Sequence, residues 1–279
     1  PTKILPAYAP RISFSYENTK TGWLLQGGTG YFAGTIPLAW LSSADLFNGV
    51  NNNSFRAGNS SLKQLRFNPN PYVQWQPSQF SDSFSMPTIN LSKGLKMPMS
   101  WKFTLLMKKN FKKNLSIQTD FLFFMNKEEM AISNIALPSP TIQLSGPDQR
   151  LVYDSNTSVG GYQEIYFLRN NEKQNGYGYQ FQVQLRKQIN FSTFNVAYLI
   201  GDAFTRYDGN FSLLSNQWKL NESVRGRNNL SLARSDFSIG QIIQCRFYRA
   251  FKLAKHQLGL QIEYHGRSGS PFSYVYGEK

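Results

Sequence analysis

Charged residues and cysteine are both scarce in this sequence of 279 residues. Lys, Arg, Asp and Glu make up 16% of it, whereas about 25% is usual in soluble globular domains. The single cysteine, Cys245, excludes an internal disulfide and any metal site built from paired cysteines. No apolar run reaches the ~18 residues that a membrane-spanning helix needs, so the sequence predicts no transmembrane helix.

Sequence motifs of catalysis are missing as well. There is no P-loop, no G-x-S-x-G, no H-E-x-x-H and no zinc-type cysteine pair. The GGTG of Gly27–Gly30 precedes no helical pattern, so these glycines are expected to allow close backbone approach rather than to bind phosphate. His256 and His265 have no cysteine or acidic cluster near them, which favours a structural role. We therefore expect no enzymatic activity, no cofactor and no metal.

What the sequence does contain is alternation. Eight segments, in four pairs, alternate apolar with polar residues and predict strands with one face of each kind. In GYGYQFQVQLRK the Tyr, Phe, Val and Leu residues fall on one parity and the Gln and Arg residues on the other. The eight segments are Arg11–Glu17, Gly22–Phe32, Trp101–Lys108, Leu115–Met125, Gly176–Lys187, Phe194–Asp202, Phe237–Tyr248 and Gln257–His265.

The connections between these segments alternate between short and long. Within a pair they are short enough for hairpins. Between pairs lie Ala33–Ser100, Asn126–Asn175 and Ala203–Asp236, which show no helical period and are expected to be loops without regular structure. Tight turns at one end and long loops at the other are typical of outer-membrane barrels. A secreted β-sandwich that binds carbohydrate is the soluble alternative, and a complete eight-stranded barrel is the small membrane alternative.

If the strands form a barrel, each of the two sets of alternate residues has an expected environment. The Gln-rich parity would line a hydrated lumen, and the apolar parity would face lipid. Aromatic residues near strand ends, such as Trp23, Trp101, Tyr177 and Tyr264, suit the interfacial girdles of a barrel. The residues expected to face lipid are Phe103, Leu105, Phe121, Phe123, Tyr179, Phe181, Val183, Leu185, Val196, Tyr198, Leu260 and Ile262.

Aromatic residues in the long connections are the candidates for ligand contact. Trp40, Tyr72, Trp75 and Trp218 could stack on sugars or peptides. Packing between the loops is the alternative role for each of them.

A formal net charge of +14 raises the question of an acidic partner. Nucleic-acid binding, a solvated surface and a charged lumen or membrane edge are the three interpretations. The densest basic cluster is KKNFKKN, Lys108 to Asn114, at an apparent turn. The basic residues form no long run, so we expect no nucleic-acid partner. A solvated turn is the simplest interpretation of this cluster, and contact with membrane headgroups is its alternative.

Several segments, in order along the chain, are similar to one known family. APRISFSY followed by LLQGGTGYFAGTIPLAWLS resembles the PRxGF and RGGTGxFTGRxPxxWLSN segments of the Oar-like TonB-dependent outer-membrane receptors of Bacteroidota, which carry a carboxypeptidase-regulatory-like domain. FNPNP, LKMPMSWKFTLLMKK, NGYGYQFQVQLRKQI, AYLIGDAF, SDFSIGQII and HGRSGSPFSYVYG continue the similarity to about Gly277. Gln26 stands where the family has Arg, and Gly240-Gln241 stands where it has Arg-His.

This resemblance implies an antiparallel transmembrane β-barrel of 22 strands that is closed by a plug. Residues 1–279 would supply about eight of those strands and the long extracellular loops, with the plug and the final strands outside them. The implied function is uptake of a bulky solute (a carbohydrate, peptide or chelate) across the Gram-negative outer membrane. The implied partners are outer-membrane lipid and the TonB–ExbB–ExbD energising complex. A surface adhesin or a secreted carbohydrate-binding β protein is the alternative function.

Overall fold

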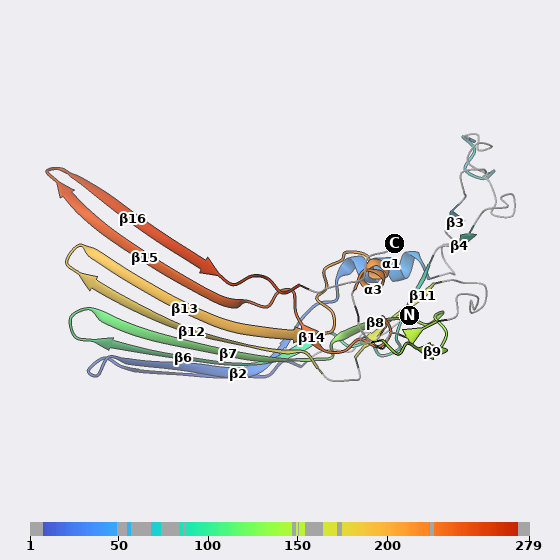
Figure 1. The fold of residues 1–279 in the computed structure, drawn as a ribbon, viewed down its shortest axis with the longest axis horizontal. Coiled ribbons are helices and arrows are strands. Elements are labelled where there is room, and N and C mark those ends of the chain that lie inside the picture. The colour runs from blue at the N-terminus through green and yellow to red at the C-terminus, as the bar shows by residue number, and fades with distance from the viewer. Residues whose placement is uncertain are drawn as a thin grey trace.

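The computed structural model is a long curved sheet with a smaller folded region at one end (Figure 1). It describes residues 8–48, 55–56, 68–73, 84–85, 87–146, 149, 151–153, 164–171, 175–221, 223 and 226–272. Within these residues, no helix has both the length and the apolar character that crossing a membrane would require.

All eight predicted strands are present, and they form one antiparallel sheet. Its order is β1-β2-β6-β7-β12-β13-β15-β16, with the short β14 (Ala233–Arg234) paired to β13. The eight strands are β1 (Arg11–Asn18), β2 (Trp23–Ala33), β6 (Met99–Phe111), β7 (Leu115–Lys127), β12 (Tyr177–Ile189), β13 (Ser192–Thr205), β15 (Gly240–Leu253) and β16 (His256–Arg267). Among the described residues β1 and β16 each pair along one edge only, so the sheet is open.

Four hairpin turns lie together at the end of the sheet opposite the smaller region (Figure 1). The last pairs before these turns are Asn18–Trp23, Phe111–Leu115, Ile189–Ser192 and Leu253–His256. Neighbouring hairpins are joined in register by Trp23–Lys109, Leu115–Lys187 and Ser192–Arg249. Each hairpin therefore extends beyond the previous one, by two, two and four residues in turn.

Backbone conformation at the turns explains how they close so tightly. Gly22 has a φ of 72°, and a Cβ there would lie 2.5 Å from the carbonyl oxygen of Asn110 on the neighbouring hairpin. Asn114 and Asn190 also adopt positive φ, a conformation that Asn tolerates better than most residues. The turn chemistry thus agrees with the strand pattern on either side.

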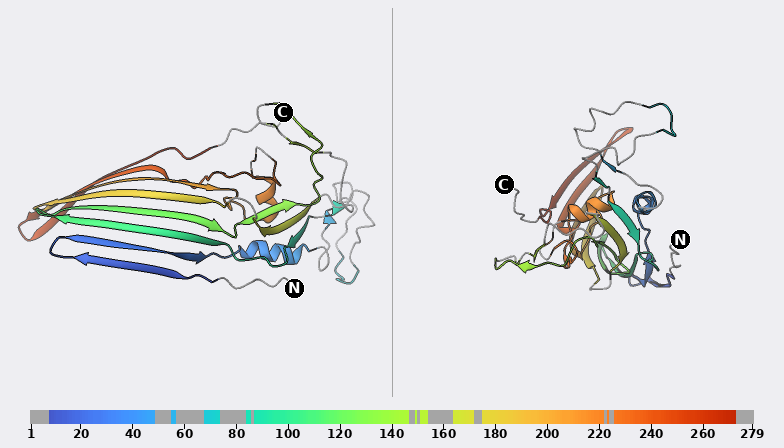
Figure 2. Two further views of the ribbon diagram at one scale, coloured as in Figure 1. Left: turned by 90° about the horizontal axis from the view of Figure 1, so that it is seen from below. Right: turned by 90° about the vertical axis from the view of Figure 1, so that its right-hand side faces the viewer.

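The long connections are not without regular structure, so that expectation was wrong. They contain α1 (Leu38–Leu46), α3 (Leu214–Lys219) and a three-stranded sheet in the order β5-β11-β8. In that sheet β5 (Thr88–Leu91) runs parallel to β11 (Ile165–Asn170), and β8 (Met130–Asn134) runs antiparallel to it. We call these five elements, with the described parts of the long connections around them, the loop cap; it lies beyond the strand ends opposite the turns (Figures 1 and 2). Two-residue ladders also join β3 (Phe55–Arg56) to β4 (Phe84–Ser85) and β9 (Ile142–Gln143) to β10 (Leu151–Val152).

The hydrophobic core lies in the loop cap and not against the large sheet. Of the buried apolar residues only Ala197 belongs to the eight long strands. The core cluster consists of Ile36, Trp40, Ala44, Ile89, Leu95, Ile132, Tyr166, Leu168, Leu214 and Trp218. One end of the molecule is thus packed like a small globular protein, while the sheet has no core of its own.

Candidate functional site

One face of the large sheet is apolar across all eight strands, and we call it the apolar face. Register carries a single row from Phe14 through Gly27, Leu105 and Phe121 to Phe181. The next row toward the turns joins Tyr16, Leu25, Met107, Thr119, Val183, Tyr198 and Ile243. All twelve residues predicted to face lipid lie on this face; that lipid is what they contact stays a prediction.

These apolar side chains are half-exposed rather than packed. Phe181 is 40% exposed, and Ile262 is 58% exposed. No described helix or second sheet packs across them. Soluble monomers rarely expose contiguous apolar patches of more than a few hundred Å², so a continuous face of this extent calls for an apolar partner.

Aromatic residues lie toward both ends of the strands on the apolar face. Toward the loop cap, Trp101 and Tyr177 share a row through Met125, and Tyr177 stacks on Phe204 at 5.1 Å between ring centroids. Toward the turns, Trp23 lies beside Lys109 of β6; the same register row ends at Tyr264, which the hairpin stagger places eight residues from its own turn, near the cap end of β16. The two rows are separated on β6 by the eight residues from Trp101 to Lys109, or ~26 Å at ~3.3 Å per residue.

The opposite face carries a network of amide, carboxyl and hydroxyl groups. Gln26 donates to the Ser15 hydroxyl at 3.2 Å, and Gln184 donates to Asn195 at 2.9 Å. Gln118 donates to Asp120, while Arg246 forms an ion pair with Glu263 at 3.0 Å. This face is not uniformly polar, because register also brings apolar residues onto it near the cap: Leu106, Leu122, Phe124, Leu199 and Ile242.

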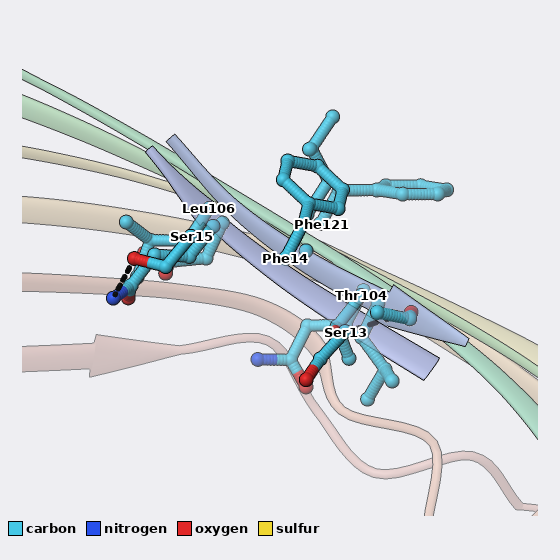
Figure 3. Close-up of a pocket in the computed structure, with 13 residues that line it drawn as sticks. Ser13, Phe14, Ser15, Thr104, Leu106 and Phe121 are labelled. Carbon is cyan, nitrogen blue, oxygen red and sulfur yellow. Dashed lines mark hydrogen bonds between the residues drawn. The ribbon is translucent and has the colours of Figure 1, made fainter. Parts of the chain in front are cut away.

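Figure 3 shows how sharply the two faces differ at the middle of β1. The Phe14 and Phe121 side chains project to one side of the ribbon, and Ser13 and Ser15 project to the other. The Phe14 ring covers Gly27, where an added Cβ would meet it at 2.7 Å. Gly27 and Gly28 have no side chains, and they line an open hollow of about 590 Å³ along these strands.

Two of the four aromatic residues proposed for ligand contact are buried in the loop cap. Trp40 is 4% exposed and donates its indole N–H to the carbonyl oxygen of Phe211 at 3.3 Å. Trp218 is 7% exposed and packs edge-on against Tyr166, with 5.6 Å between ring centroids. In this arrangement both rings pack between loops, which was the alternative role considered for them.

The other two aromatic residues differ from this pair and from each other. Tyr72 is 94% exposed and is thus accessible to a solute. Trp75 lies outside the described residues. Ligand contact remains a prediction for these side chains, and the structure does not bring the four together into one binding surface.

Asparagine side chains in the loop cap hold its backbone together, and the sequence analysis missed them. The Asn228 amide donates to the carbonyl oxygen of Asn134 at 2.7 Å. Its side-chain oxygen accepts from the Asn134 backbone N–H and from the Trp218 indole N–H, both at 2.8 Å. In turn the Asn134 side chain accepts from the backbone of Ala136 and Ile165. Nothing in the local sequence distinguishes these residues from other Asn residues, because Asn134 and Asn228 lie 94 positions apart in the chain.

Tyr207 links the loop cap to the end of β13. Its hydroxyl donates to the carbonyl oxygen of Ile132 at 2.6 Å and accepts from the backbone N–H of the same residue at 3.3 Å. Burial raises the pKa of Tyr207 from 10.0 to about 12. Burial also raises the pKa of Tyr166 in the cap core. Both hydroxyls are therefore neutral in the physiological range, and that of Tyr207 also contributes hydrogen bonds to the cap.

A small hollow of about 290 Å³ separates the loop cap from the sheet. Asp202 and Asp208 lie in its wall with Gln180 and Phe237. Their carboxylates are already engaged: Asp202 pairs with Arg234 at 2.6 Å, and Asp208 accepts from the Ser235 hydroxyl at 2.5 Å. Among the described residues no group of three His, Cys, Asp or Glu side chains could hold a metal ion. This hollow is thus part of the cap's attachment to the sheet.

Comparison with family models and with curated proteins does not identify the family of this chain. No family model matches the chain. A search of the curated proteins also returned no match.

Proposed function

We propose that this chain is part of a TonB-dependent outer-membrane receptor, a β-barrel that takes up a bulky solute. The observation that carries the proposal is the apolar face: eight antiparallel strands present it without a packing partner among the described residues. A bilayer supplies the apolar medium that such a face needs. The sequence resemblance supplies the family and, with it, the expected plug and the TonB–ExbB–ExbD complex.

The stagger of the hairpins supports a tilted barrel wall. Four turns can lie at one membrane level only if the strands tilt enough to offset the eight-residue shift from the first hairpin to the last. That shift is ~27 Å along the strands at ~3.4 Å per residue, across six strand spacings, or ~29 Å at ~4.8 Å each. The corresponding tilt is about 43°, within the roughly 35–45° of outer-membrane barrels.

The spacing of the aromatic rows supports the same orientation. Strands tilted by about 43° convert the ~26 Å between the Trp101 and Trp23 rows into ~19 Å of membrane depth. An apolar band of such barrels is about 25 Å tall between girdles at its two interfaces. Trp101 and Trp23 therefore lie near the expected boundaries of the band on β6 and β2, and Phe181 lies between these two levels.

The loop cap would then face the outside and meet the solute first. Its buried core and amide contacts make it a preformed surface rather than a set of independent loops. Tyr72, the exposed member of the predicted aromatic set, is the residue there that is best placed for stacking on a sugar or peptide. Energy for passage would come from TonB acting on the plug.

Photolabelling in native membranes tests the membrane assignment. Outer membranes from cells that make the full-length protein are irradiated with a probe confined to the acyl region, and labelled peptides are mapped. We expect label on Phe181 and Ile262 and none on Gln182 or Gln261, their neighbours on the opposite face. Label on the glutamine rows instead, or recovery of the protein in the soluble fraction, would favour a carbohydrate-binding sandwich or an adhesin and overturn the proposal.

Cross-linking in cells tests the energised-transport part separately. We expect a covalent adduct of the full-length receptor with TonB that disappears when the receptor's TonB-contacting segment is deleted. Membrane labelling without any TonB adduct would keep the barrel and overturn active uptake.

A further inference from the structure

The hairpin turns form a strongly basic rim at one end of the sheet. Residues 17–24, 108–116, 185–195 and 248–257 contain ten Lys or Arg side chains and a single carboxylate, Glu17. We call these ten cations the basic rim. Because the hairpin stagger matches strand tilt, all four turns reach one level if the sheet stands in a membrane as proposed above.

The cations of this rim are not neutralised by the protein. Among the described residues, none of the ten takes part in a salt bridge. At the opposite end of the sheet three cations are paired: Lys96 with Glu128 at 2.8 Å, Lys219 with Glu164 at 2.7 Å and Arg234 with Asp202 at 2.6 Å. The turns therefore carry ten cations against one carboxylate, and none of these cations is ion-paired among the described residues.

The basic rim also has a concave site. A hollow of about 610 Å³ lies between the β1–β2 and β6–β7 turns, with Lys20, Lys108, Lys109 and Lys112 in its wall and Glu17 as its one carboxylate. Trp23 and Phe111 line it as well. The Lys109 ammonium lies 4.7 Å from the Trp23 ring centroid and donates to the carbonyl oxygen of Thr21 at 2.5 Å. Lys109 is thereby held in place beside the aromatic row.

Aromatic side chains accompany the cations at other turns too. The Arg249 guanidinium lies 5.1 Å from the Phe251 ring centroid, and the Lys252 ammonium lies 5.3 Å from that of Phe191. Long cationic side chains above aromatic rings are typical of the membrane interface, where the ring contacts acyl chains and the charge reaches the headgroup layer. The rim therefore combines both elements that a lipid headgroup would contact.

We propose that the basic rim, with the hollow between the first two turns as its principal site, binds the phosphate of anionic phospholipid headgroups. Four lysines outweigh the single Glu17 carboxylate around this hollow and supply the positive charge that a phosphodiester needs, and Trp23 and Phe111 supply contact for the glycerol and the first acyl carbons. The proposal rests on the proposed membrane function. It goes further by assigning a lipid class to the turn end of the sheet and not to the cap end.

A headgroup titration of the purified full-length protein in a non-ionic detergent tests the inference. Short-chain phosphatidylglycerol and phosphatidylcholine of the same acyl length are titrated in parallel, and bound lipid is counted by native mass spectrometry. We expect phosphatidylglycerol to bind at least about tenfold more tightly, because polybasic segments favour anionic lipid. Raising the salt from 50 to 500 mM should shrink this preference.

Two triple variants with equal charge loss locate the site. Lys20→Gln, Lys108→Gln and Lys112→Gln together remove hollow cations but leave Lys109 in contact with the turn. We expect this variant to lose most of the phosphatidylglycerol preference. The control combines Lys93→Gln, Lys102→Gln and Lys127→Gln, which lie outside the four turns, and should keep the preference.

Each alternative outcome has a distinct meaning. Equal affinity for the two lipids, or equal loss in both triple variants, would overturn the inference while leaving the barrel intact. Competition by inorganic phosphate or polyglutamate at concentrations as low as those of the lipid would overturn it too, because the site would then recognise charge alone. A protein that needs no detergent would instead overturn the membrane function itself.

Discussion

The large sheet and the loop cap solve the problem of apolar side chains in opposite ways. In the cap, Tyr166, Leu95 and Leu168 are fully buried, and helices and strands pack around them. In the sheet, apolar residues of the same kinds, such as Leu185 and Tyr198, remain about 40% exposed on one continuous face. The apolar side chains of the cap are therefore buried by other parts of the cap. Those of the sheet would need an apolar medium that the described chain does not supply.

The two regions also differ in which groups form hydrogen bonds with their backbone N–H and C=O groups. The long strands pair their own N–H and C=O groups with adjacent strands over as many as 13 residue pairs. The cap has short elements, so side chains such as Asn134 and Asn228 complete its hydrogen bonds. Damage to a core residue should thus disturb the cap alone, and damage to the apolar face should disturb the sheet alone.

Truncation of the cap core is the strongest way to separate the two regions. Leu168→Ala removes a fully buried side chain from β11, and such changes cost about 2–5 kcal/mol. Hydrogen exchange of the full-length protein should show lost protection in β5, β8 and β11 and unchanged protection in β12 and β13. Leu185→Ala, on the apolar face, is the control and should leave the cap protected. Loss of protection in the long strands would mean that cap and sheet fold as one unit.

A charge on the apolar face probes the other region. Phe181→Lys places an ammonium group on the face proposed to contact lipid, midway between the aromatic rows, and should cost about 2–4 kcal/mol of folding free energy in a bilayer. Gln182→Lys adds the same charge one residue along, on the opposite face, and should cost close to nothing. Denaturant titration of the reconstituted protein measures both variants. A larger cost for Gln182→Lys would reverse the assignment of the two faces.

The difference between the regions also explains what the sequence could predict. Each of the eight strands has a period of two and pairs with a hairpin neighbour, so the pattern and its partner lie close together in the chain. The cap depends on contacts across the chain: Trp40 in α1 bonds to Phe211, 171 positions away. In α1 apolar residues alternate with small ones on every side (LAWLSSADL), which hides any helical period. β5 and β11 pair in parallel with more than 70 residues between them.

Candidate site residues follow the same division. Alternation alone placed all twelve predicted lipid-facing residues on one face, because parity fixes the side of a strand. The loop aromatics could not be sorted in this way, since exposure there depends on distant partners. Trp40 and Trp218 are buried and Tyr72 is exposed, although all three lie in long connections without a strand or helix period.

Removing an amide contact should have a smaller effect than emptying the cap core. Asn228→Ala leaves the Asn134 backbone N–H and the Trp218 indole N–H without their acceptor. Partly buried donors without acceptors cost about 1–3 kcal/mol, so we expect a loss of about 2 kcal/mol confined to the cap. Asn210→Ala, which removes an exposed contact to Asp236, is the control and should change hydrogen exchange in the cap very little. Equal effects of the two variants would assign no special role to the Asn228 contacts.

Tyr207 gives the smallest expected effect and the one that depends on pH. Tyr207→Phe keeps the ring but loses the hydroxyl contacts to Ile132, at a cost of about 1 kcal/mol near neutral pH. The folded-state pKa is raised from 10.0 to about 12. The neutral hydroxyl therefore stabilises the cap fully below pH 10, and this contribution is lost as the pH rises to about 12, because the unfolded chain releases the proton first.

The stability gap between the native protein and Tyr207→Phe should consequently close between pH 10 and 12. Hydrogen exchange of cap peptides cannot be followed easily at that pH, so the gap is measured by denaturant titration with a fluorescent label on the cap. Tyr72→Phe removes an exposed hydroxyl and is the matched control. A gap that stays constant to pH 12 would show that the Tyr207 hydroxyl titrates like an exposed one, and the link between the cap and β13 would then rest on packing of the ring rather than on its buried hydrogen bond.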